Sequence, residues 1–277
     1  MPRLTQLLVI DPQNDFCDLP AAAGRAPALP VAGADADLRR VAALIDAAGA
    51  AIDAITVTLD THQRVDIAHP PFWQQADGSE VAPFTTITAA QLRAGAFRPR
   101  DPAALPRAQA YVDALEARGR YTLMVWPVHC EIGGWGQQVH AGLAAACARW
   151  TAAQGRRVVE VTKGENPWTE HYSAVQAEVP LAGDAGTQLN TALIAALDRA
   201  ELLLIAGEAG SHCVRATTEH IVDHLPGGRL ERVVLLTDCM SPVPGFEAQQ
   251  RDFLAAMQAR GVRLTTAAEA LALLQAR

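Results

Sequence analysis

Three residues of this chain have side chains suited to nucleophilic catalysis, and each follows an apolar run typical of a buried strand. They are Asp11, Lys163 and Cys213, and a helix is expected to begin beside Cys213. A nearby ammonium and a helix N-terminus would both favour the thiolate of a cysteine. A carboxylate can take the thiol proton and later pass it to a leaving amine. If they converge, the three predict a cysteine nucleophile with acid–base assistance.

Each of these residues also has an ordinary interpretation. Asp11 could cap a turn, Cys213 could fill the core, and Lys163 could be a surface residue kept by chance. Lys163 is the only lysine, however, so the other 22 of the 23 basic residues are arginine. Lysine carries a compact ammonium whose pKa can shift, whereas the guanidinium stays charged. Three such residues at strand ends favour the catalytic interpretation.

A second group of residues has the character of metal ligands. In Asp60-Thr61-His62 the first and third side chains point the same way if the chain is extended. His69 follows seven residues later, and His129 follows another apolar run. One carboxylate with two or three imidazoles suits Zn²⁺, Mn²⁺ or Fe²⁺. Because Asp-x-His is common, spacing alone leaves a purely structural role open.

The elements that must position these residues alternate between strands and helices. We expect strands at residues 7–10, 54–59, 121–125, 158–161, 202–206, 233–236 and 262–265. We expect helices at residues 36–48, 187–200, 214–225 and 248–260. This alternation predicts an α/β fold with a doubly wound, mostly parallel sheet of Rossmann-like shape, covered by helices on both faces. Such a sheet binds ligands beyond the C-terminal strand ends, where the strand order reverses.

Two stretches break this rhythm. Residues 63–120 are rich in Pro, Gly and polar residues and carry two modest helical stretches, at 89–94 and 103–118. Residues 164–186 form a second irregular segment. Long excursions inside a domain are usually lids or binding loops. We therefore expect a single domain over residues 1–277, with a long insertion at about 63–120 that borders the cleft.

Composition and charge narrow the function classes. The 277 residues include 30 acidic and 23 basic ones, for a formal charge of −7, without a Lys/Arg cluster. Nucleic acid and anionic membrane are therefore not expected as partners. No apolar run is long enough to span a bilayer and no export signal is seen, so a cytoplasmic protein is expected. The five cysteines lack a CxxC pair and are expected to be free thiols.

Taken together, the motifs resemble those of the isochorismatase-like cysteine hydrolases, and most of all the nicotinamidases. They are Asp11-Pro12-Gln13-Asn14-Asp15-Phe16, Asp60-x-His62, Trp126-Pro127-x-His129-Cys130, Lys163-Gly164 and the glycine-containing segment that ends in Cys213-Val214. They occur in the family's order from residue 7 to about 220. The resemblance implies the isochorismatase-like hydrolase fold, a homo-oligomer, and hydrolysis of a small-molecule amide. The implied reaction converts nicotinamide to nicotinate and ammonia, which is a step of NAD salvage.

The resemblance also implies the catalytic roles. Cys213 would be the nucleophile, Asp11 the general base and acid, and Lys163 the cation that supports the thiolate and the transition state. The backbone N–H groups of Ala209 and Cys213 would form the oxyanion hole. The Glu208–Ala209 peptide bond is expected to be cis.

Metal and substrate contacts follow from the same resemblance. Asp60, His62 and His129 match the metal ligands, and His69 approximates a fourth ligand used by some members. The expected cofactor is a divalent metal, Zn²⁺ first and Mn²⁺ or Fe²⁺ as alternatives, which would hold the pyridine nitrogen. Phe16 and Trp126 would sandwich the substrate ring. Glu208 is also expected at the substrate, where the family usually has an aliphatic residue. Further residues expected to line the cleft are Glu131, Glu165, Trp168 and His171.

Two other functions stay open at this point. One is a related hydrolase of ureido or carbamoyl amides, for which the metal ligands would be less necessary. The other is a catalytically silent member that acts as a binding protein, although Asp11, Lys163 and Cys213 are all present. The isochorismatase reaction itself is less favoured because it does not require the cysteine.

Overall fold

A computed structural model describes residues 4–22 and 24–276 of the chain, and within them six parallel strands form the central sheet. The sheet order is β10-β9-β8-β1-β2-β7. The strands are β1 (Thr5–Ile10), β2 (Ala54–Asp60), β7 (Val159–Lys163), β8 (Leu202–Gly207), β9 (Val233–Leu236) and β10 (Arg263–Thr265). β1 and β8 are buried along their whole length, as their continuous apolar sequences predict for central parallel strands. The predicted doubly wound α/β fold is confirmed.

The strand order reverses between β1 and β8. From β1 the chain moves outward through β2 to β7, then returns to the other side of β1 and moves outward again from β8 to β10. Ile10 pairs with Gly207 at the C-terminal end of this central pair. A Cβ atom at Gly207 would lie 2.0 Å from the carbonyl oxygen of Ile10, so glycine is required there. Asp11 and the segment after β8 therefore meet where such sheets bind ligands.

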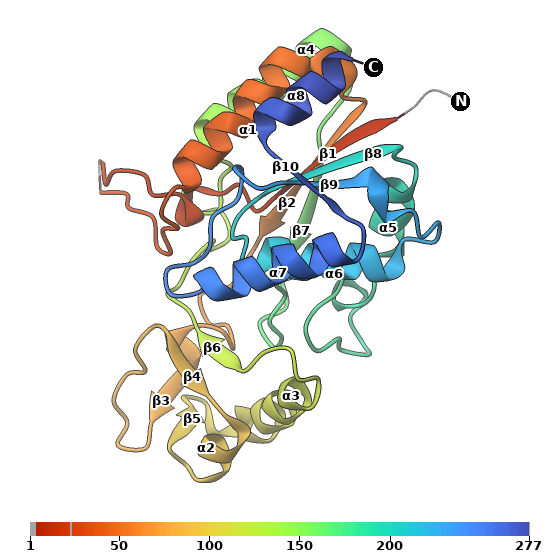
Figure 1. The fold of residues 1–277 in the computed structure, drawn as a ribbon. Coiled ribbons are helices and arrows are strands. Elements are labelled where there is room, and N and C mark those ends of the chain that lie inside the picture. The colour runs from red at the N-terminus through yellow and green to blue at the C-terminus, as the bar shows by residue number, and fades with distance from the viewer. Residues whose placement is uncertain (1–3, 23, 277) are drawn as a thin grey trace.

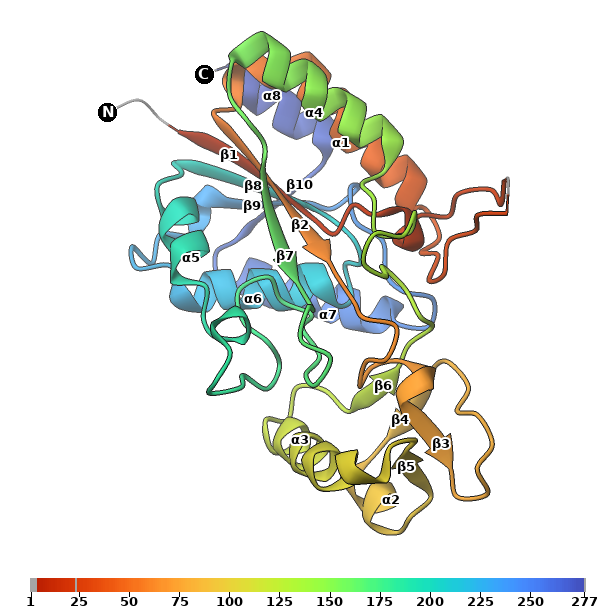
Figure 2. The same ribbon diagram turned by 180° about the vertical axis from the view of Figure 1, so that it is seen from behind.

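Helices cover both faces of the sheet, as predicted (Figures 1 and 2). α1 (Ala34–Ala48), α4 (Ala141–Gln154) and α8 (Ala267–Gln275) lie on one face, and α5 (Thr191–Asp198), α6 (Cys213–His224) and α7 (Glu247–Ala259) lie on the other. Alternate residues of β1 supply the two cores. Leu7 and Val9 belong to the core with α1, and Leu8 and Ile10 belong to the core with α6.

The insertion is a folded lobe beyond the C-terminal edge of the sheet (Figure 1). It contains β3 (Trp73–Gln75), β4 (Thr85–Ile87), α2 (Ala89–Arg93), β5 (Phe97–Pro99), α3 (Leu105–Ala117) and β6 (Leu123–Val125). β3 pairs with β5 and β4 pairs with β6, both antiparallel. The lobe has its own apolar core, which includes Trp73, Ile87 and Val112.

This lobe corrects the placement of one predicted strand. Residues 121–125 were expected to join the parallel sheet, but β6 pairs with β4 and closes the lobe. β7 occupies the sheet position next to β2 instead. The inserted lobe therefore extends to residue 125, five residues beyond its predicted end.

The remaining connections are short helical turns and coil. The 3₁₀ turns are Asn14–Phe16, Gly49–Ala51, Pro70–Phe72, Pro102–Ala104, Ala185–Thr187 and Leu230–Arg232. Residues 164–184 form the predicted irregular segment, and much of it is buried. All five cysteines are buried free thiols, as predicted. Across the described ranges, no helix has both the length and the apolar character that a membrane span requires.

Candidate active site

Two strands of the sheet and one helix bring Asp11, Lys163 and Cys213 into one buried group. Asp11 follows β1, Lys163 is the last residue of β7, and Cys213 is the first residue of α6. The Nζ atom of Lys163 lies 2.9 Å from Oδ2 of Asp11 and 3.7 Å from Sγ of Cys213. Thr58 donates its hydroxyl proton to Oδ1 of Asp11 at 2.6 Å. The arrangement places an acid–base group and a cation around a thiol.

Burial sets the protonation states of this group. It raises the pKa of the Cys213 thiol well above its usual range, and the nearby Lys163 ammonium offsets this only in part. Burial likewise raises the pKa of Asp11 against the opposing effect of Lys163. Although burial alone would lower it, Asp11 and Asp60 hold the pKa of Lys163 well above its usual range. The thiol therefore needs a base that can remove its proton.

The segment between β8 and α6 carries the reacting backbone groups. The Glu208–Ala209 peptide bond is cis, as predicted. Ala209 and Cys213 both line the pocket described below. Because Cys213 begins α6, its N–H is one of the helix N-terminal groups without an acceptor inside the helix. The carbonyl of Ala209 accepts hydrogen bonds from the amides of His212 and Val214, which fixes this turn.

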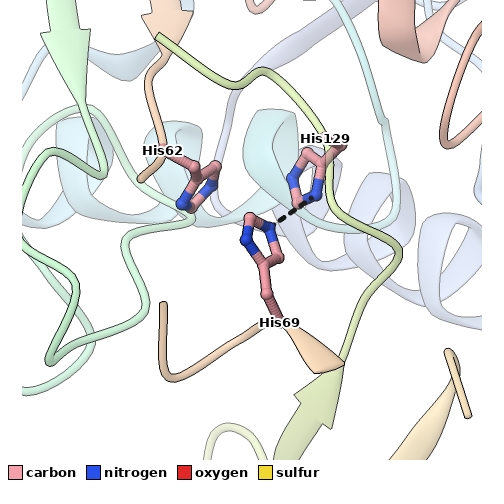
Figure 3. A group of neighbouring side chains, drawn as sticks. All are labelled: His62, His69 and His129. Carbon is pink, nitrogen blue, oxygen red and sulfur yellow. Dashed lines mark hydrogen bonds between the residues drawn. The ribbon is translucent and has the colours of Figure 1, made fainter. Parts of the chain in front are cut away.

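The predicted metal ligands also come together. One ring nitrogen each from His62, His69 and His129 lies within 4.8 Å of the others, and all three residues are buried (Figure 3). His69 Nε2 lies 3.2 Å from His129 Nδ1. Oδ2 of Asp60 lies 3.1 Å from Nε2 of His62 and 3.4 Å from Nε2 of His129. Three imidazoles therefore lie together, and the Asp60 carboxylate lies beside two of them.

The surroundings of these ligands fit a divalent metal. Nδ1 of His62 lies 3.2 Å from Asp66, and Nδ1 of His69 lies 3.2 Å from the carbonyl oxygen of Gln63, so in both rings Nε2 is left for a metal. Burial lowers the pKa of His69 to about 2, so its imidazole is neutral as a metal ligand must be. Although burial opposes it, Asp60 and Asp66 hold the pKa of His62 well above its usual range, so a metal would have to displace a proton from His62. Asp66 was not predicted from the sequence, because a carboxylate four residues after a histidine carries no specific signal.

Asp60 joins the two groups. Its Oδ1 lies 2.9 Å from Nζ of Lys163, and its Oδ2 faces His62 and His129. Although burial opposes ionisation, His62 and Lys163 hold the pKa of Asp60 well below its usual range. A charged Asp60 therefore couples the lysine of the nucleophilic group to the candidate metal site.

A mostly apolar pocket opens onto both groups. Its lining is Phe16, Leu29, Asp60, Trp126, His129, Glu170, Tyr172, Ala209, His212, Cys213 and Val243. Phe16 and Trp126 are thus placed where the resemblance predicted aromatic walls. The thiol lies in the same lining as His129 and Asp60, so a small aromatic amide can reach both groups.

Sequence reasoning missed several of these lining residues. Glu170 and Tyr172 belong to the irregular segment that was expected to border the cleft. The segment was therefore predicted, but nothing in the sequence singled out these two residues. Leu29 and Val243 lie in loops without such a signal. Of the other residues expected to line the cleft, Glu165 is exposed and Glu131 pairs with Arg64. Trp168 packs against Phe72 of the lobe, and His171 is buried outside the pocket lining.

The expectation that Glu208 contacts the substrate is not met. Glu208 is fully buried and lies outside the pocket lining. Its Oε2 accepts a hydrogen bond from the amide of Ser241 at 3.2 Å, and its carboxyl faces Asp37 of α1. In the segment after β8, Ala209 faces the pocket while the Glu208 side chain is directed toward α1.

Comparison of the chain with family models gives no match, and comparison with curated proteins gives none either. Solved structures do match along nearly the whole chain. A nicotinamidase/pyrazinamidase from Acinetobacter baumanii has a TM-score of 0.63 and 20% identity, and the match covers 97% of this chain and 98% of that one. A yeast nicotinamidase has a TM-score of 0.61 and 20% identity over 95% and 99% of the two chains.

A third match is the Pyrococcus horikoshii pyrazinamidase in complex with zinc. Its TM-score is 0.55 at 21% identity, and the match covers 95% of this chain and 98% of that one. The chain has the nicotinamidase fold. At these identities the likeness concerns the fold, and the chemistry has to be argued from the residues of the site.

Proposed function

We propose that this protein is a metal-assisted cysteine amidohydrolase that converts nicotinamide, or a closely similar aromatic carboxamide, to the carboxylate and ammonia. The observation that carries the proposal is that Asp11, Lys163 and Cys213 form one buried group at the pocket. The fold likeness to nicotinamidases supports the same reaction.

The reaction begins with the thiol. Asp11 takes the proton of Cys213 as the sulfur attacks the amide carbon, and the carbonyl oxygen becomes an oxyanion. The N–H groups of Ala209 and Cys213 receive that oxyanion. Lys163 stabilises the thiolate as it forms. Protonated Asp11 then gives its proton to the leaving nitrogen, and ammonia departs from a thioester on Cys213.

Hydrolysis of the thioester restores the enzyme. Asp11, again a carboxylate, takes a proton from water as the oxygen attacks the thioester carbon. The thiolate leaves, the carboxylic acid is released, and the proton returns from Asp11 to Cys213. Atoms balance as one amide and one water giving one acid and one ammonia.

The residues that would hold the metal are Asp60, His62, His69 and His129, and Zn²⁺, Mn²⁺ or Fe²⁺ suits this donor set. When bound, the metal supplies a Lewis-acidic anchor for a ring nitrogen. Phe16 and Trp126 hold the two faces of the ring. This donor set favours a pyridine-type amide over the carbamoyl alternative, which has less need of it.

The deciding experiment is ammonia release from nicotinamide by the metal-loaded protein, with Cys213→Ala in parallel. Cys147→Ala is the matched control, since Cys147 is also a buried thiol but lies in α4. We expect release by the wild type and the control and none by Cys213→Ala. Release that survives in Cys213→Ala would rule out the thioester route. A wild type inactive on nicotinamide would overturn the substrate assignment.

Four broader expectations stay predictions. A homo-oligomer is checked by sedimentation, and a cytoplasmic location by fractionation. A single domain predicts one cooperative unfolding transition for the sheet and the lobe together. The role in NAD salvage depends on nicotinamide being the substrate.

A further inference from the structure

Glu208 and Asp37 form a pair of buried carboxyl groups behind the segment that carries Ala209. Glu208 is 0% exposed and Asp37 is 4% exposed. Oε1 of Glu208 has no hydrogen-bond donor beside it among the described residues, and its carboxyl lies within hydrogen-bonding reach of Asp37. Ser241 contacts both of them, with its amide donating to Glu208 Oε2 at 3.2 Å and its hydroxyl donating to Asp37 Oδ2 at 2.6 Å. A hydrogen bond between two carboxyl groups requires one of them to hold a proton.

The surrounding charges keep one proton in this pair. Within the described part of the chain, Arg40 is the cation that reaches it, 3.2 Å from Asp37 Oδ1. The other ionisable groups that face the pair are Asp18, Asp238 and the thiols of Cys17 and Cys239. Two adjacent carboxylates in one buried site repel each other, so a second negative charge beside Asp37 is strongly disfavoured with only Arg40 to offset it. Because Arg40 lies at Asp37, the proton belongs on Glu208.

Burial supports the same assignment. It raises the pKa of Glu208 well above its usual range, and the negative charge of Asp37 acts in the same direction. Burial also raises the pKa of Asp37, while the Ser241 hydroxyl opposes the shift. Glu208 is therefore a neutral acid that donates to Asp37 and accepts from Ser241.

This pair is tied directly to the backbone of the active site. The amide of Glu208 donates to the carbonyl of Ile10 at 2.8 Å, next to Asp11. The amide of Gly210 donates to the carbonyl of Ser241 at 2.8 Å. These contacts hold the chain on both sides of Ala209, the proposed oxyanion-hole donor that lies four residues before Cys213.

We propose that Glu208 is a positioning residue. Its neutral carboxyl group, bonded to Asp37 and Ser241, fixes the positions of Ala209 and Cys213 relative to Asp11. Glu208 does not touch the substrate, so its contribution is to the geometry of the transition state. The measurement of amide turnover rests on the proposed function. The position of Cys213 can also be probed by alkylation, which needs no amide substrate.

The test compares Glu208→Gln with Glu208→Leu in the metal-loaded full chain. Glutamine keeps a neutral donor and an acceptor, so it should retain wild-type kcat and KM at neutral pH. Leucine has similar bulk but no hydrogen bonds, so kcat should fall by about 10²-fold while KM changes little, as expected for a displaced catalytic group. Asp35→Asn, also in α1, is the control for a lost charge outside the pair, and it should behave as wild type.

A pH series separates positioning from packing. Above the raised pKa of Glu208 the pair would carry two negative charges, so wild-type kcat should fall at alkaline pH, and Glu208→Gln should lack that fall. The raised pKa also means that the contribution of Glu208 to the stability of the folded state is greatest below the ordinary glutamate pKa. The stability contributed by Glu208 is then lost as pH rises toward the folded-state value, and Glu208→Gln should not lose it. The melting temperature against pH measures this difference.

Alkylation of Cys213 by iodoacetamide provides a readout independent of the amide. Glu208→Leu should change its rate relative to the wild type, and Glu208→Gln should not. The proposal is overturned if Glu208→Leu has wild-type kcat, or if Glu208→Gln is as impaired as Glu208→Leu or shows the wild-type alkaline fall. If Glu208→Leu does not fold, the Glu208→Gln profile and its alkylation rate still decide. A wild type that is inactive on nicotinamide refutes the proposed function alone. The alkylation rates and the melting temperatures then decide whether Glu208 is a positioning residue.

Discussion

At the scale of single residues, Lys163 has the most demanding environment in the site. Its ammonium lies 2.9 Å from both Asp11 and Asp60 and 3.7 Å from the Cys213 sulfur, with its side chain 1% exposed. One compact charge thus contacts two buried carboxyl groups and faces the Cys213 sulfur. A planar guanidinium is larger and cannot make the same three contacts from one nitrogen.

Lys163→Arg should therefore lower kcat/KM by at least roughly 10²-fold, the scale of losing one preorganised charge contact. Circular dichroism should show that the variant still folds. Arg149→Lys is the matched control, because Arg149 forms an exposed pair with Asp46 and such pairs contribute little. A Lys163→Arg enzyme with normal turnover would refute the role given to the ammonium.

The pKa of Asp11 predicts the acid side of the activity profile. Because burial raises this pKa despite Lys163, Asp11 takes up a proton at a pH above the ordinary aspartate value. Asp11 must be unprotonated to accept the thiol proton, so kcat/KM should fall as pH decreases through this raised pKa. The pH dependence of ammonia release measures it. An acid limb at the ordinary aspartate pKa, or activity retained in Asp11→Asn, would contradict the assignment.

Residue types and their positions after apolar runs were enough to predict most of this site. Asp11, Lys163 and Cys213 each follow a strand that the sequence makes obvious, and parallel strands bring such residues to one edge. Glu208 could not be oriented in the same way, because the direction of a side chain in a turn after a strand depends on the turn. Leu29 and Val243 reach the pocket through tertiary packing that has no local pattern.

At the scale of elements, the inserted lobe supports the irregular segment that lines the pocket. The hydroxyl of Tyr111 in α3 accepts a hydrogen bond from the amide of Glu170 at 2.9 Å. Arg107 of α3 stacks over the ring of Trp168 at 4.0 Å, and Phe72 packs against the edge of the same ring. The lobe therefore holds Glu170 and Tyr172 in place although it contributes no residue of its own to the pocket lining.

Tyr111→Phe tests this support. It leaves the buried Glu170 amide without its acceptor, which should cost about 1–3 kcal/mol of unfolding free energy and raise KM. The matched control is Tyr121→Phe, since the Tyr121 hydroxyl is buried and has no hydrogen-bond partner among residues 4–22 and 24–276. Denaturant unfolding and amide kinetics measure both variants. Equal effects of the two substitutions would show that the lobe contact does not matter.

The strands of the sheet and the two helices of the lobe were predictable from the sequence, whereas β3, β4 and β5 of the lobe were not, for a physical reason. β1 contains the apolar run 7–10 and β8 contains the apolar run 202–206, each long enough to identify a buried strand. The strands of the lobe are three residues long, and their sequences do not alternate in a recognisable way. Their pairing depends on a small shared core around Trp73. The short strands between residues 63 and 120 are therefore not recognisable from the sequence.

At the scale of the whole molecule, the candidate metal site joins the sheet to the lobe. His62 follows β2 where the chain enters the lobe, His69 lies at the start of the lobe, and His129 follows β6 where the chain leaves it. A metal held by these residues would fasten both connections at one point. Its binding should stabilise the folded state by mass action, by about 2.7 kcal/mol at a free metal concentration of 100 Kd.

Chelation followed by dialysis should therefore lower both amide turnover and the melting temperature. Hydrogen exchange should increase at residues 63–125 more than in β1 or β8, because the lobe loses its fastening. Added Zn²⁺ should reverse these changes in the wild type but not in His62→Ala. His224→Ala, at an exposed histidine, is the control. Unchanged exchange and melting after complete metal removal would exclude this structural role.

Because Lys163 is the only lysine and is buried, proteolysis at this residue can report when the folded protein opens. A lysine-specific endoprotease has one peptide bond to cut in the whole chain, between Lys163 and Gly164. In the folded protein that lysine side chain is enclosed at the end of β7 against Asp11 and Asp60. Cleavage into two fragments of predictable mass would therefore record each opening of the catalytic centre, and a bound substrate should slow it.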